Sequence, residues 1–381
     1  MLKNNQDALA VIFANSYDNE VTPLVSERLM ASIPFAARYR LIDFTLSSLV
    51  NSGIDNVSII VRKNYRSLMR HLGSGRPWDL SRKKGGLNIV PPYAEKSVSV
   101  YNGRVEALTS ILEFLKAQKE EYIFISDSNI VANFNFRTML EEHKANNADV
   151  TIAYKCEPIP YGFMNLQPTT KTDLYYTLTL QDKRITEIQT NPKEYGPQNL
   201  SMNIYLLRRE LLIEMISKAY ARGDCFFERD VLSHQLDSLR VYGYEYKNYT
   251  ARITDLISYF NENMSMLQPR NLDALFAPAP IYTTVRDDNP TRYLNGAHAK
   301  NCLVADGCVI EGQVENCILF RGVKIGRGTK LRNCLVMQDT VIEGNCDIEY
   351  MITDKEVRIT SGQEMKGSPS FPIFVPAYKE L

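Results

Sequence analysis

The residue types that most often carry catalysis are scattered along this chain. The four histidines lie at positions 71, 143, 234 and 298 and form no pair at the spacing of a metal or catalytic site. The seven cysteines lie at positions 156, 225, 302, 308, 317, 334 and 346. They form no CxxC pair and lie near no histidine at zinc-finger spacing, so we interpret them as small buried apolar residues. These patterns predict no metal centre.

Basic side chains gather in two short stretches that could bind an anion. The first holds Arg38 and Arg40, and the second holds Arg82, Lys83 and Lys84. Structural ion pairs are the alternative for the first stretch, and a solvated loop is the alternative for the second. The chain has 44 basic and 44 acidic residues, so no net field draws it to nucleic acid or to anionic lipid. Any anion site must therefore be local.

The elements that position these residues begin with an α/β pattern. Short β-branched or aromatic runs predict strands at 8–13, 57–61, 122–126 and 150–154. Between them, apolar residues recur at helical spacing, as in 41–50, where Gly53 supplies a C-terminal cap. This alternation predicts a Rossmann-like, mostly parallel sheet with helices on both faces, and ligands at the carboxyl ends of its strands.

The last quarter of the chain carries a six-residue repeat. The strings NCLV at 301–304, NCIL at 316–319 and NCLV at 333–336 recur, and apolar residues stand at every sixth position in three runs. Those residues are Val304 and Ile310, then Leu319, Ile325 and Leu331, then Val336, Ile342 and Ile348. This period predicts a parallel β-helix in which each hexapeptide supplies one face of a triangular coil.

The length, the composition and a Pro-rich segment indicate how the chain divides into domains. A length of 381 residues with 44% hydrophobic content predicts about two domains. We place an α/β domain at 1–252, a helix and Pro-rich linker at 253–293, and the β-helix with a C-terminal tail at 294–381. The apolar run at 8–14 is too short for a signal peptide or a membrane span, so we expect a cytoplasmic protein.

Several strings resemble the ADP-glucose pyrophosphorylase family, in which an α/β nucleotidyltransferase domain precedes a left-handed β-helix. They are RYRLIDF at 38–44 with NSGI at 51–54, PWDL at 77–80, GGLNIVPP at 85–92 and SMNIY at 201–205. The resemblance spans nearly the whole chain in the right order. It implies transfer of the adenylyl group of ATP to glucose 1-phosphate, a reaction that needs charge compensation around a polyphosphate.

The family's catalytic groups are replaced in this sequence. Its Gly-rich phosphate loop falls on residues 15–24, where no glycine remains and acids stand at Asp18 and Glu20. A family lysine corresponds to Met30, and the two Mg²⁺-binding carboxylates correspond to Asn129 and Arg252. The degenerate positions are Asn15, Ser16, Asp18, Glu20, Met30, Asn129 and Arg252. We therefore expect no Mg²⁺ site in this chain, and Arg252 could fill the space of an ion with its own charge.

The sugar-phosphate side is altered as well. Asn191 stands within the position of the family's EKP motif, and Phe226-Phe227-Glu228 stands where the family has DFG. The surviving or corresponding positions are Tyr161, Gly162, Asn191, Ser201 and Tyr205. Ser201 and Tyr205 could still hold a sugar or could serve as structural hydrogen-bonding groups.

The resemblance implies a D-type, non-catalytic regulatory or scaffolding subunit of this family. Mg²⁺ would enter only through a catalytic ADP-glucose pyrophosphorylase partner, in a heterotetramer, with a homo-oligomer as the possible state of the chain alone. Family members place the motif of Arg38 and Arg40 near the interface where phosphorylated effectors bind, so these two arginines are effector-binding candidates.

Two other functions stay open on sequence grounds. An active adenylyltransferase with an atypical site could use Asp127 and Asp18 for the metal. An acyltransferase could work through the β-helix, but such enzymes place a histidine between coils, and we expect His298 to precede them.

Overall fold

The computed structural model describes residues 7–19, 21–91, 101, 103–164 and 174–381. Within those ranges, nine strands form one sheet in the order β5-β4-β1-β6-β11-β8-β12-β10-β9. In that order the strands are β5 Gly86–Val90, β4 Asn56–Ile60, β1 Ala8–Phe13, β6 Tyr122–Asp127, β11 Pro197–Arg208, β8 Val150–Pro158, β12 Val241–Glu245, β10 Arg184–Thr190 and β9 Tyr176–Gln181. The four strands expected from sequence are all present.

The parallel arrangement expected for most of the sheet holds for its first half and for one later pair. Strands β5, β4, β1 and β6 are parallel, as are β8 and β12. By contrast, β11 runs antiparallel to both β6 and β8, and β9 and β10 form an antiparallel hairpin. The sheet is therefore mixed. The Asp182–Lys183 turn joins β9 directly to β10, and so short a connection reverses the strand direction.

Helices cover both faces of the sheet, as the sequence predicts. The α-helices of this domain and its linker are α1 Thr22–Val25, α2 Leu41–Asn51, α3 Arg66–Leu72, α4 Arg104–Thr109, α5 Leu112–Ala117, α6 Phe136–Ala145, α7 Tyr161–Met164, α8 Arg209–Arg222, α9 Leu256–Ser265 and α10 Pro269–Phe276. Helices α2, α3 and α6 share one core with the sheet, and α4, α5 and α8 share another. Short helical turns lie at Met30–Ser32, Arg76–Trp78, Phe227–Leu232 and Ser233–Gln235. The core strand β1 is buried at every position, as a central parallel strand requires.

Two small antiparallel ribbons complete the α/β domain. They are β2 Pro34–Phe35 with β3 Tyr39–Arg40, and β7 Ile130–Val131 with β13 Ala251–Arg252. The second ribbon brings Asn129 and Arg252 into the same part of the fold although they lie far apart in sequence. Helix α10 within the linker was not expected from the sequence.

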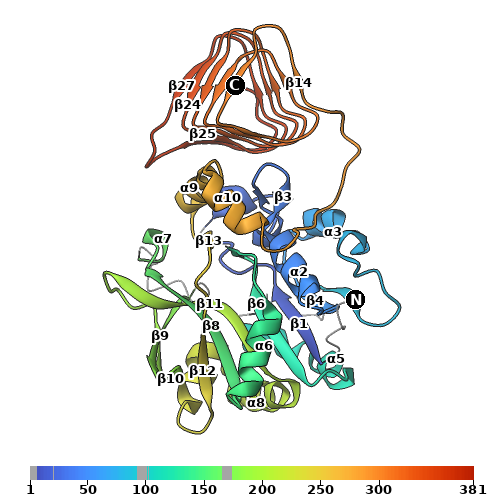
Figure 1. Cartoon of the computed structure of the whole chain (residues 1–381), viewed down its shortest axis with the longest axis vertical. Helices are drawn as coiled ribbons and strands as arrows, with labels where there is room; N and C mark the ends of the chain where they lie inside the picture. Colours follow the sequence, from blue (N-terminus) through green and yellow to red (C-terminus); the bar gives the residue numbers. More distant parts are fainter. Residues whose placement is uncertain (1–6, 20, 92–100, 102, 165–173) are drawn as a thin grey trace.

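The C-terminal domain is the left-handed parallel β-helix that the six-residue period predicts, and Figure 1 shows its coils stacked as a triangular prism. Its first sheet holds β14 Arg292–Tyr293, β17 Val309–Ile310, β20 Lys324–Ile325, β23 Val341–Ile342 and β26 Arg358–Ile359. The second holds β15 His298–Lys300, β18 Gln313–Glu315, β21 Lys330–Arg332, β24 Asp347–Glu349 and β27 Glu364–Lys366. The third holds β16 Leu303–Val304, β19 Ile318–Leu319, β22 Leu335–Val336, β25 Met351–Thr353 and β28 Ile373–Val375.

The Asn-Cys repeat has a structural explanation. Asn301, Asn316 and Asn333 occupy one corner of successive coils in the left-handed backbone region, with φ of 50°, 50° and 53°. Asparagine tolerates this region better than most residues. Of the cysteines that follow, those at 317 and 334 are buried inside the prism, as are Cys308 and Cys346. The interpretation as buried residues fails for Cys156, which is exposed.

The two domains share a hydrophobic core. The third sheet of the β-helix faces α9 and α10, so that Ile318, Leu335 and Ile352 pack in one cluster with Tyr259, Phe260 and Leu275. A buried ion pair also crosses the interface, with Arg28 Nη2 2.5 Å from Asp354 Oδ1. The prism therefore packs sideways on the α/β domain. Across the described ranges, no helix is both long and apolar enough to span a bilayer.

Candidate functional site

Hydrogen bonds from its own side chains fix the conformation of the loop after β1. Asn15 accepts a hydrogen bond from the backbone N–H of Arg62 (2.7 Å) and donates one to Asp18 (2.6 Å). The other carboxylate oxygen of Asp18 accepts from the backbone N–H of Met30 (2.8 Å). Burial raises the pKa of Asp18 to about 6. Glu20 lies outside the described residues. The side chains of Asn15 and Asp18 thus bond within the chain.

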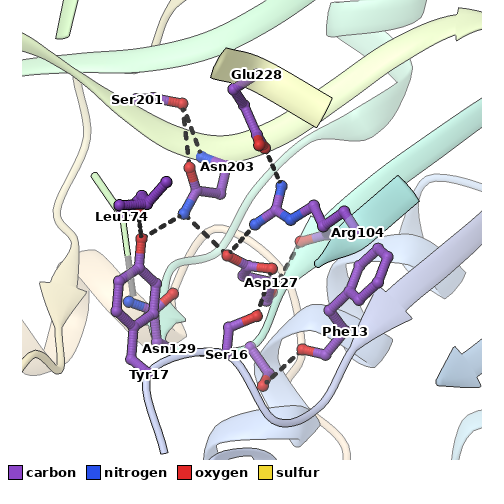
Figure 2. A network of polar contacts seen from close by, with 12 residues as sticks. Phe13, Ser16, Tyr17, Arg104, Asp127, Asn129, Leu174, Ser201, Asn203 and Glu228 are labelled. Carbon is purple, nitrogen blue, oxygen red and sulfur yellow. Dashed lines mark hydrogen bonds and ion pairs between the residues drawn. The ribbon is translucent and has the colours of Figure 1, made fainter. Parts of the chain in front are cut away.

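A cavity of about 260 Å³ lies at the carboxyl ends of β1 and β6, where the fold predicts a ligand. Arg104, the first residue of α4, is one of the residues that line it. Arg104 Nη2 lies 2.5 Å from Asp127 Oδ2, and Nη1 lies 2.5 Å from Glu228 Oε1 (Figure 2). The exposed fractions of the two carboxylate side chains are only 1% and 4%.

Local packing fixes Arg104 in this place. A Cβ atom on Gly103 would lie 2.1 Å from the carbonyl oxygen of Cys225, so only glycine allows α4 to begin this close to the 225–228 segment. The guanidinium carbon lies 5.3 Å from the centre of the Phe13 ring and 5.5 Å from that of Tyr205. Burial alone would lower the pKa of Arg104, but the carboxylates of Asp127 and Glu228 hold it well above its usual value.

Asn203 extends this network to the loop after β1. It stands in the middle of the SMNIY string with φ of 55°, within a register shift between β11 and β8. Its amide nitrogen donates to Asp127 Oδ2 (2.8 Å) and to the hydroxyl of Tyr17 (2.9 Å) (Figure 2). Ser16 donates to the other oxygen of Asp127 at 2.7 Å. The polar groups at the strand ends therefore satisfy one another.

Aromatic rings fill the neighbouring space. Tyr17 packs on Phe163 with ring centres 5.3 Å apart, and Phe163 stacks on Tyr175 with centres 4.8 Å apart. The Tyr17 hydroxyl donates to the carbonyl oxygen of Leu174 at 2.6 Å. These contacts connect the loop after β1 to α7 and to the segment before β9, and Tyr17 and Leu174 line the cavity.

The donor groups at this site do not fit a magnesium ion. Mg²⁺ prefers carboxylate oxygens in octahedral geometry, but both oxygens of Asp127 are engaged by Arg104, Ser16 and Asn203. Asn129 is fully buried, and its amide nitrogen is 3.4 Å from the carbonyl oxygen of Ile253. Asp127 and Asp18, the alternative metal ligands expected from the sequence, both accept hydrogen bonds within the chain.

Arg252, which the sequence suggests could fill the space of an ion, has partners within the chain. Its guanidinium binds Glu157 (3.0 Å) and the backbone oxygen of Ser201 (3.1 Å). The cation that lies between two buried carboxylates is Arg104, which the sequence did not single out. Arg104 is 124 positions from Glu228 along the chain, so only the fold reveals this contact.

The expected sugar-phosphate residues do not converge on one pocket. Tyr161 is 72% exposed, and Gly162 packs against Thr254 and Asp255, where a Cβ atom would lie within 2.8 Å of their side-chain oxygens. Asn191 accepts a hydrogen bond from the backbone N–H of Tyr175 at 2.8 Å. Ser201 and Tyr205 are buried, and both lie within hydrogen-bonding distance of Asn203. Their structural interpretation is the one that these contacts favour.

A second cavity, of about 440 Å³, lies between the two domains and brings together one of the predicted basic stretches. Arg38 and Arg40 both line it. Its basic lining residues are Arg28, Arg38, Arg40, Arg70, Arg286, Arg321 and Lys355. Among the described residues that line it, none is acidic.

The cationic cavity concentrates charge that its own chain only partly compensates. Burial lowers the pKa of Arg40 to about 10, and burial together with Arg38 lowers the pKa of Arg321. Arg40 is anchored by the backbone and side-chain oxygens of Ser67 at 3.0 and 2.9 Å. An anion would relieve the mutual repulsion of these guanidinium groups. The second predicted stretch, at 82–84, is instead an exposed loop in which Arg82 pairs with Asp55 and Asp79.

The histidines have structural surroundings. His71 Nε2 lies 2.6 Å from Asp43 Oδ1 beside the cationic cavity, and buried His143 lies 2.7 Å from Thr151 Oγ1. We expected His298 to precede the coils, but it lies in β15 of the first coil, where it is exposed. The expectation was wrong because the first coil begins before the first repeat string, so the repeat did not reveal that His298 belongs to it. Within the described ranges, no group of three or more His, Cys, Asp or Glu side chains could hold a metal ion.

Glu262 of α9 gives the domain a measurable pH response. Burial and, to a smaller extent, the nearby carboxylate of Glu157 raise its pKa to about 7, against the opposing effect of the hydrogen bond that Tyr249 donates to it at 3.1 Å. A carboxyl group whose pKa is higher in the folded state stabilises the fold fully below its unfolded value of 4.5. That contribution is lost as the pH rises through about 7.

We therefore expect Glu262→Gln to raise the melting temperature by a few degrees at about pH 8 and to change it little at about pH 4.5, since glutamine keeps an oxygen for Tyr249 and carries no charge. Thermal unfolding followed by circular dichroism at the two pH values measures this. Glu141→Gln, at an exposed position of α6, is the control and should change neither value. A lower melting temperature for Glu262→Gln at alkaline pH would contradict the argument.

Comparison with known proteins agrees with this architecture. Residues 9–265 match the family described as nucleotidyl transferase, and residues 284–368 match the one described as GlmU-like, C-terminal hexapeptide. A glycogen biosynthesis protein GlgD of Bacillus subtilis (strain 168) is 36% identical over 371 residues, covering 97% of this chain and 95% of that protein. GlgD of Geobacillus stearothermophilus is 35% identical over 85% of this chain and 82% of its own. A glucose-1-phosphate adenylyltransferase of Thermosipho africanus (strain TCF52B) is 31% identical over 85% of this chain and 77% of its own.

The fold and the two matched segments define the class: a nucleotidyltransferase-type α/β domain joined to a hexapeptide β-helix. The similarity to the Bacillus subtilis relative extends over nearly the whole of both chains. The chain belongs to the family of glycogen biosynthesis nucleotidyltransferases that contains the GlgD proteins and the glucose-1-phosphate adenylyltransferases.

Proposed function

We propose that this chain is a regulatory or scaffolding subunit of glucose-1-phosphate adenylyltransferase in glycogen biosynthesis, with little or no activity alone. One observation carries the proposal: the guanidinium of Arg104 lies between Asp127 and Glu228 at the strand ends where a metal-bound nucleotide would react. Phosphoryl-type transfer depends on cations and donors aimed at a polyphosphate. In this chain Arg104, Asp127 and Glu228 pair with one another at those strand ends, whereas the buried Oδ1 of Asn129 has no hydrogen-bond partner among the described residues.

The partner in this proposal is a catalytic subunit that supplies Mg²⁺, ATP and glucose 1-phosphate binding. Assembly into a hetero-oligomer, expected as a tetramer, would then connect the intact architecture of this chain to the active subunit. The extensive likeness to proteins named for glycogen biosynthesis supports this assignment.

The cavity between the domains supports an effector role. Seven basic side chains line it, and it is large enough to admit a small phosphorylated metabolite. An effector bound there would contact both the α/β domain and the β-helix, because Arg38 and Arg321 belong to different domains. We infer that this chain reads such an anion and passes the response to the catalytic partner.

The experiment compares the purified catalytic subunit of the same cell with and without this chain. Turnover and the response to phosphorylated sugars are measured for both. We expect the chain to change the turnover or the effector response. With Arg38→Ala/Arg321→Ala, the half-saturating effector concentration should rise at least about tenfold, since each guanidinium–phosphate contact contributes more than a neutral hydrogen bond.

The control variant is Lys83→Ala/Lys84→Ala, which removes two positive charges from an exposed loop away from the cavity. It should leave the effector response unchanged. Equal turnover and superimposable effector curves with and without the wild-type chain would refute the regulatory proposal. An unchanged effector response in the Arg38/Arg321 variant would refute only the assignment of the cavity as the effector site and would leave the regulatory proposal standing.

A further inference from the structure

His71 lines the cationic cavity between the two domains, and a buried carboxylate holds its ring in place. Its Nε2 lies 2.6 Å from Oδ1 of Asp43, and only 8% of its side chain is exposed. The ring packs edge-on against Trp78, with ring centres 5.9 Å apart. The hydroxyl of Thr284, in the linker, donates to the backbone oxygen of His71 at 2.5 Å. The imidazole therefore has a fixed position at the wall of the cavity.

Asp43 is fully buried, and its partners come from three parts of the chain. Besides His71 of α3, it accepts hydrogen bonds from the backbone N–H of Arg40 (2.9 Å) and from the hydroxyl of Thr283 in the linker (2.6 Å). The guanidinium of Arg40 is directed instead to Ser67. A negative charge beside an imidazole favours the protonated ring. Asp43 is thus placed to stabilise an imidazolium at the cavity wall.

The charged groups that line the cavity with His71 act in the opposite direction. They come from the segment before the Met30–Ser32 turn, the β2–β3 hairpin, α3, the linker and the β-helix, and all are basic. They are Arg28, Arg38, Arg40, Arg70, Arg286, Arg321 and Lys355. Like charges oppose protonation of an imidazole, and a bound anion would offset them. Anion binding and protonation of His71 should therefore favour each other, and such coupling is reciprocal.

Two polar atoms at this cavity have no hydrogen-bond partner among the described residues. They are Oγ of Ser32, a residue that is 1% exposed, and Nε of Arg321. Ser32 lines the cavity from the α/β domain, and Arg321 lines it from the β-helix. A buried donor without a partner costs free energy unless a ligand satisfies it. The cavity therefore offers a hydroxyl and a guanidinium N–H to an acceptor such as an oxyanion.

The arginines cannot give this cavity a pH response in the neutral range. Burial lowers the pKa of Arg40 only to about 10, so it stays charged there. Histidine is the side chain whose ordinary charge change falls between about pH 5 and 8. Asp18 and Glu262, whose pKa values are raised to about 6 and about 7, are not among the described residues that line the cavity. His71 is the lining residue that can gain a positive charge in this range.

We propose that the cationic cavity takes up a proton on His71 when it binds an oxyanion, so that its affinity for the anion falls as the pH rises. Nε2 donates to Asp43, and the proton passes from the solvent to Nδ1. The inference rests on the proposed function only in that the cavity binds an anion, and it requires no effect on a partner. Acidity then becomes a second signal that the same site reads.

The test uses inorganic sulfate as the probe, because sulfate is a doubly charged anion at every pH used, whereas a phosphate group titrates near about pH 6. Isothermal titration calorimetry of the full-length chain in two buffers of different ionisation enthalpy gives the number of protons taken up. We expect about 0.3–1 proton per sulfate near pH 7, and an affinity that falls at least about threefold between pH 6 and pH 8.

Three variants assign the proton and the anion. His71→Gln keeps an N–H for Asp43 but cannot gain a proton, so proton uptake should vanish and the affinity should no longer depend on pH. His234→Gln, at an exposed position that does not line the cavity, is the matched control and should behave like wild type. Ser32→Ala should weaken sulfate binding about tenfold and leave the proton uptake per bound sulfate unchanged. The melting temperature of each variant shows that the fold is intact.

A measurement on the wild-type chain does not depend on how the variants fold. The chain has four histidines, so isotope labelling of histidine gives four ring signals in the NMR spectrum. Saturating sulfate should move the titration midpoint of one of these signals to higher pH, and that signal should be missing from His71→Gln. If no midpoint moves, the inference is overturned.

The other outcomes separate this inference from the regulatory role. Absence of sulfate binding, absence of proton uptake, uptake that persists in His71→Gln, or unchanged affinity in Ser32→Ala would each overturn the inference. The proposed function is judged separately, by the turnover and effector response of the catalytic subunit. If proton uptake is as expected but the chain changes neither of these, the regulatory role fails and the inference stands.

Discussion

Replacing Arg104 by methionine is expected to lower the free energy of unfolding by about 3–5 kcal/mol, because it leaves two buried carboxylates without their cation. Asp127 and Glu228 have almost no exposure to solvent. Denaturant unfolding near neutral pH measures the loss. The deficit should shrink in acid, since protonation neutralises the carboxylates that methionine leaves unpaired.

Arg82 provides the matched control for that experiment. It also pairs with two carboxylates, Asp55 and Asp79, but on the surface, where its side chain is 30% exposed. Arg82→Met should therefore cost less than about 1 kcal/mol. Combining Arg104→Met with Asp127→Asn and Glu228→Gln should recover much of the lost stability, since all three charges then disappear together. Similar losses for Arg104→Met and Arg82→Met would contradict the central role of the buried network.

The isolated chain is expected to transfer adenylyl groups at a rate at least roughly 10⁴-fold below that of a catalytic relative, given that loss of one preorganised donor already costs about 10²–10³. Several groups are lost together here. The loop after β1 is closed on itself, Arg104 occupies the strand ends, and the Tyr17–Phe163–Tyr175 rings fill the adjoining space. Pyrophosphate release from ATP, Mg²⁺ and glucose 1-phosphate measures the rate.

The glucose-1-phosphate adenylyltransferase of Thermosipho africanus, assayed in parallel, serves as the positive control. Restoring one carboxylate with Asn129→Asp should leave the chain inactive, because Arg104 still lies between Asp127 and Glu228 at the strand ends. Turnover by the wild-type chain within a hundredfold of the control enzyme would show that the internal network opens to admit substrate.

The β-helix could be predicted in detail because its signal is local. Each inward residue repeats at a fixed spacing, and the asparagine corners at 301, 316 and 333 adopt the left-handed backbone that the repeated Asn-Cys strings favour. The first strands of the α/β domain were equally clear, since buried parallel strands appear as short apolar runs. Helix α10 was missed because it is short and follows directly on α9 within the linker.

The candidate site could be predicted only in part. The resemblance in sequence predicts that the family's glycines and carboxylates are replaced, but it does not predict the contacts that the structure shows in their place. Arg104 and Glu228 meet only through the fold, and the antiparallel course of β11 brings Asn203 to the same point. One local signal was available: asparagine tolerates the left-handed backbone region, and Asn203 in SMNIY has a φ of 55°.

The packing of the third β-helix sheet against α9 and α10 limits how the two domains can move relative to each other. The domain interface buries Ile318, Leu335 and Ile352 as fully as the core of either domain buries its own residues. The buried Arg28–Asp354 ion pair lies in the same interface. A hinge needs loosely packed residues that can absorb rotation, and this joint has a continuous core instead. The two domains should therefore move as one rigid body. A partner that binds the end of the β-helix far from the interface would then also fix the orientation of the α/β domain.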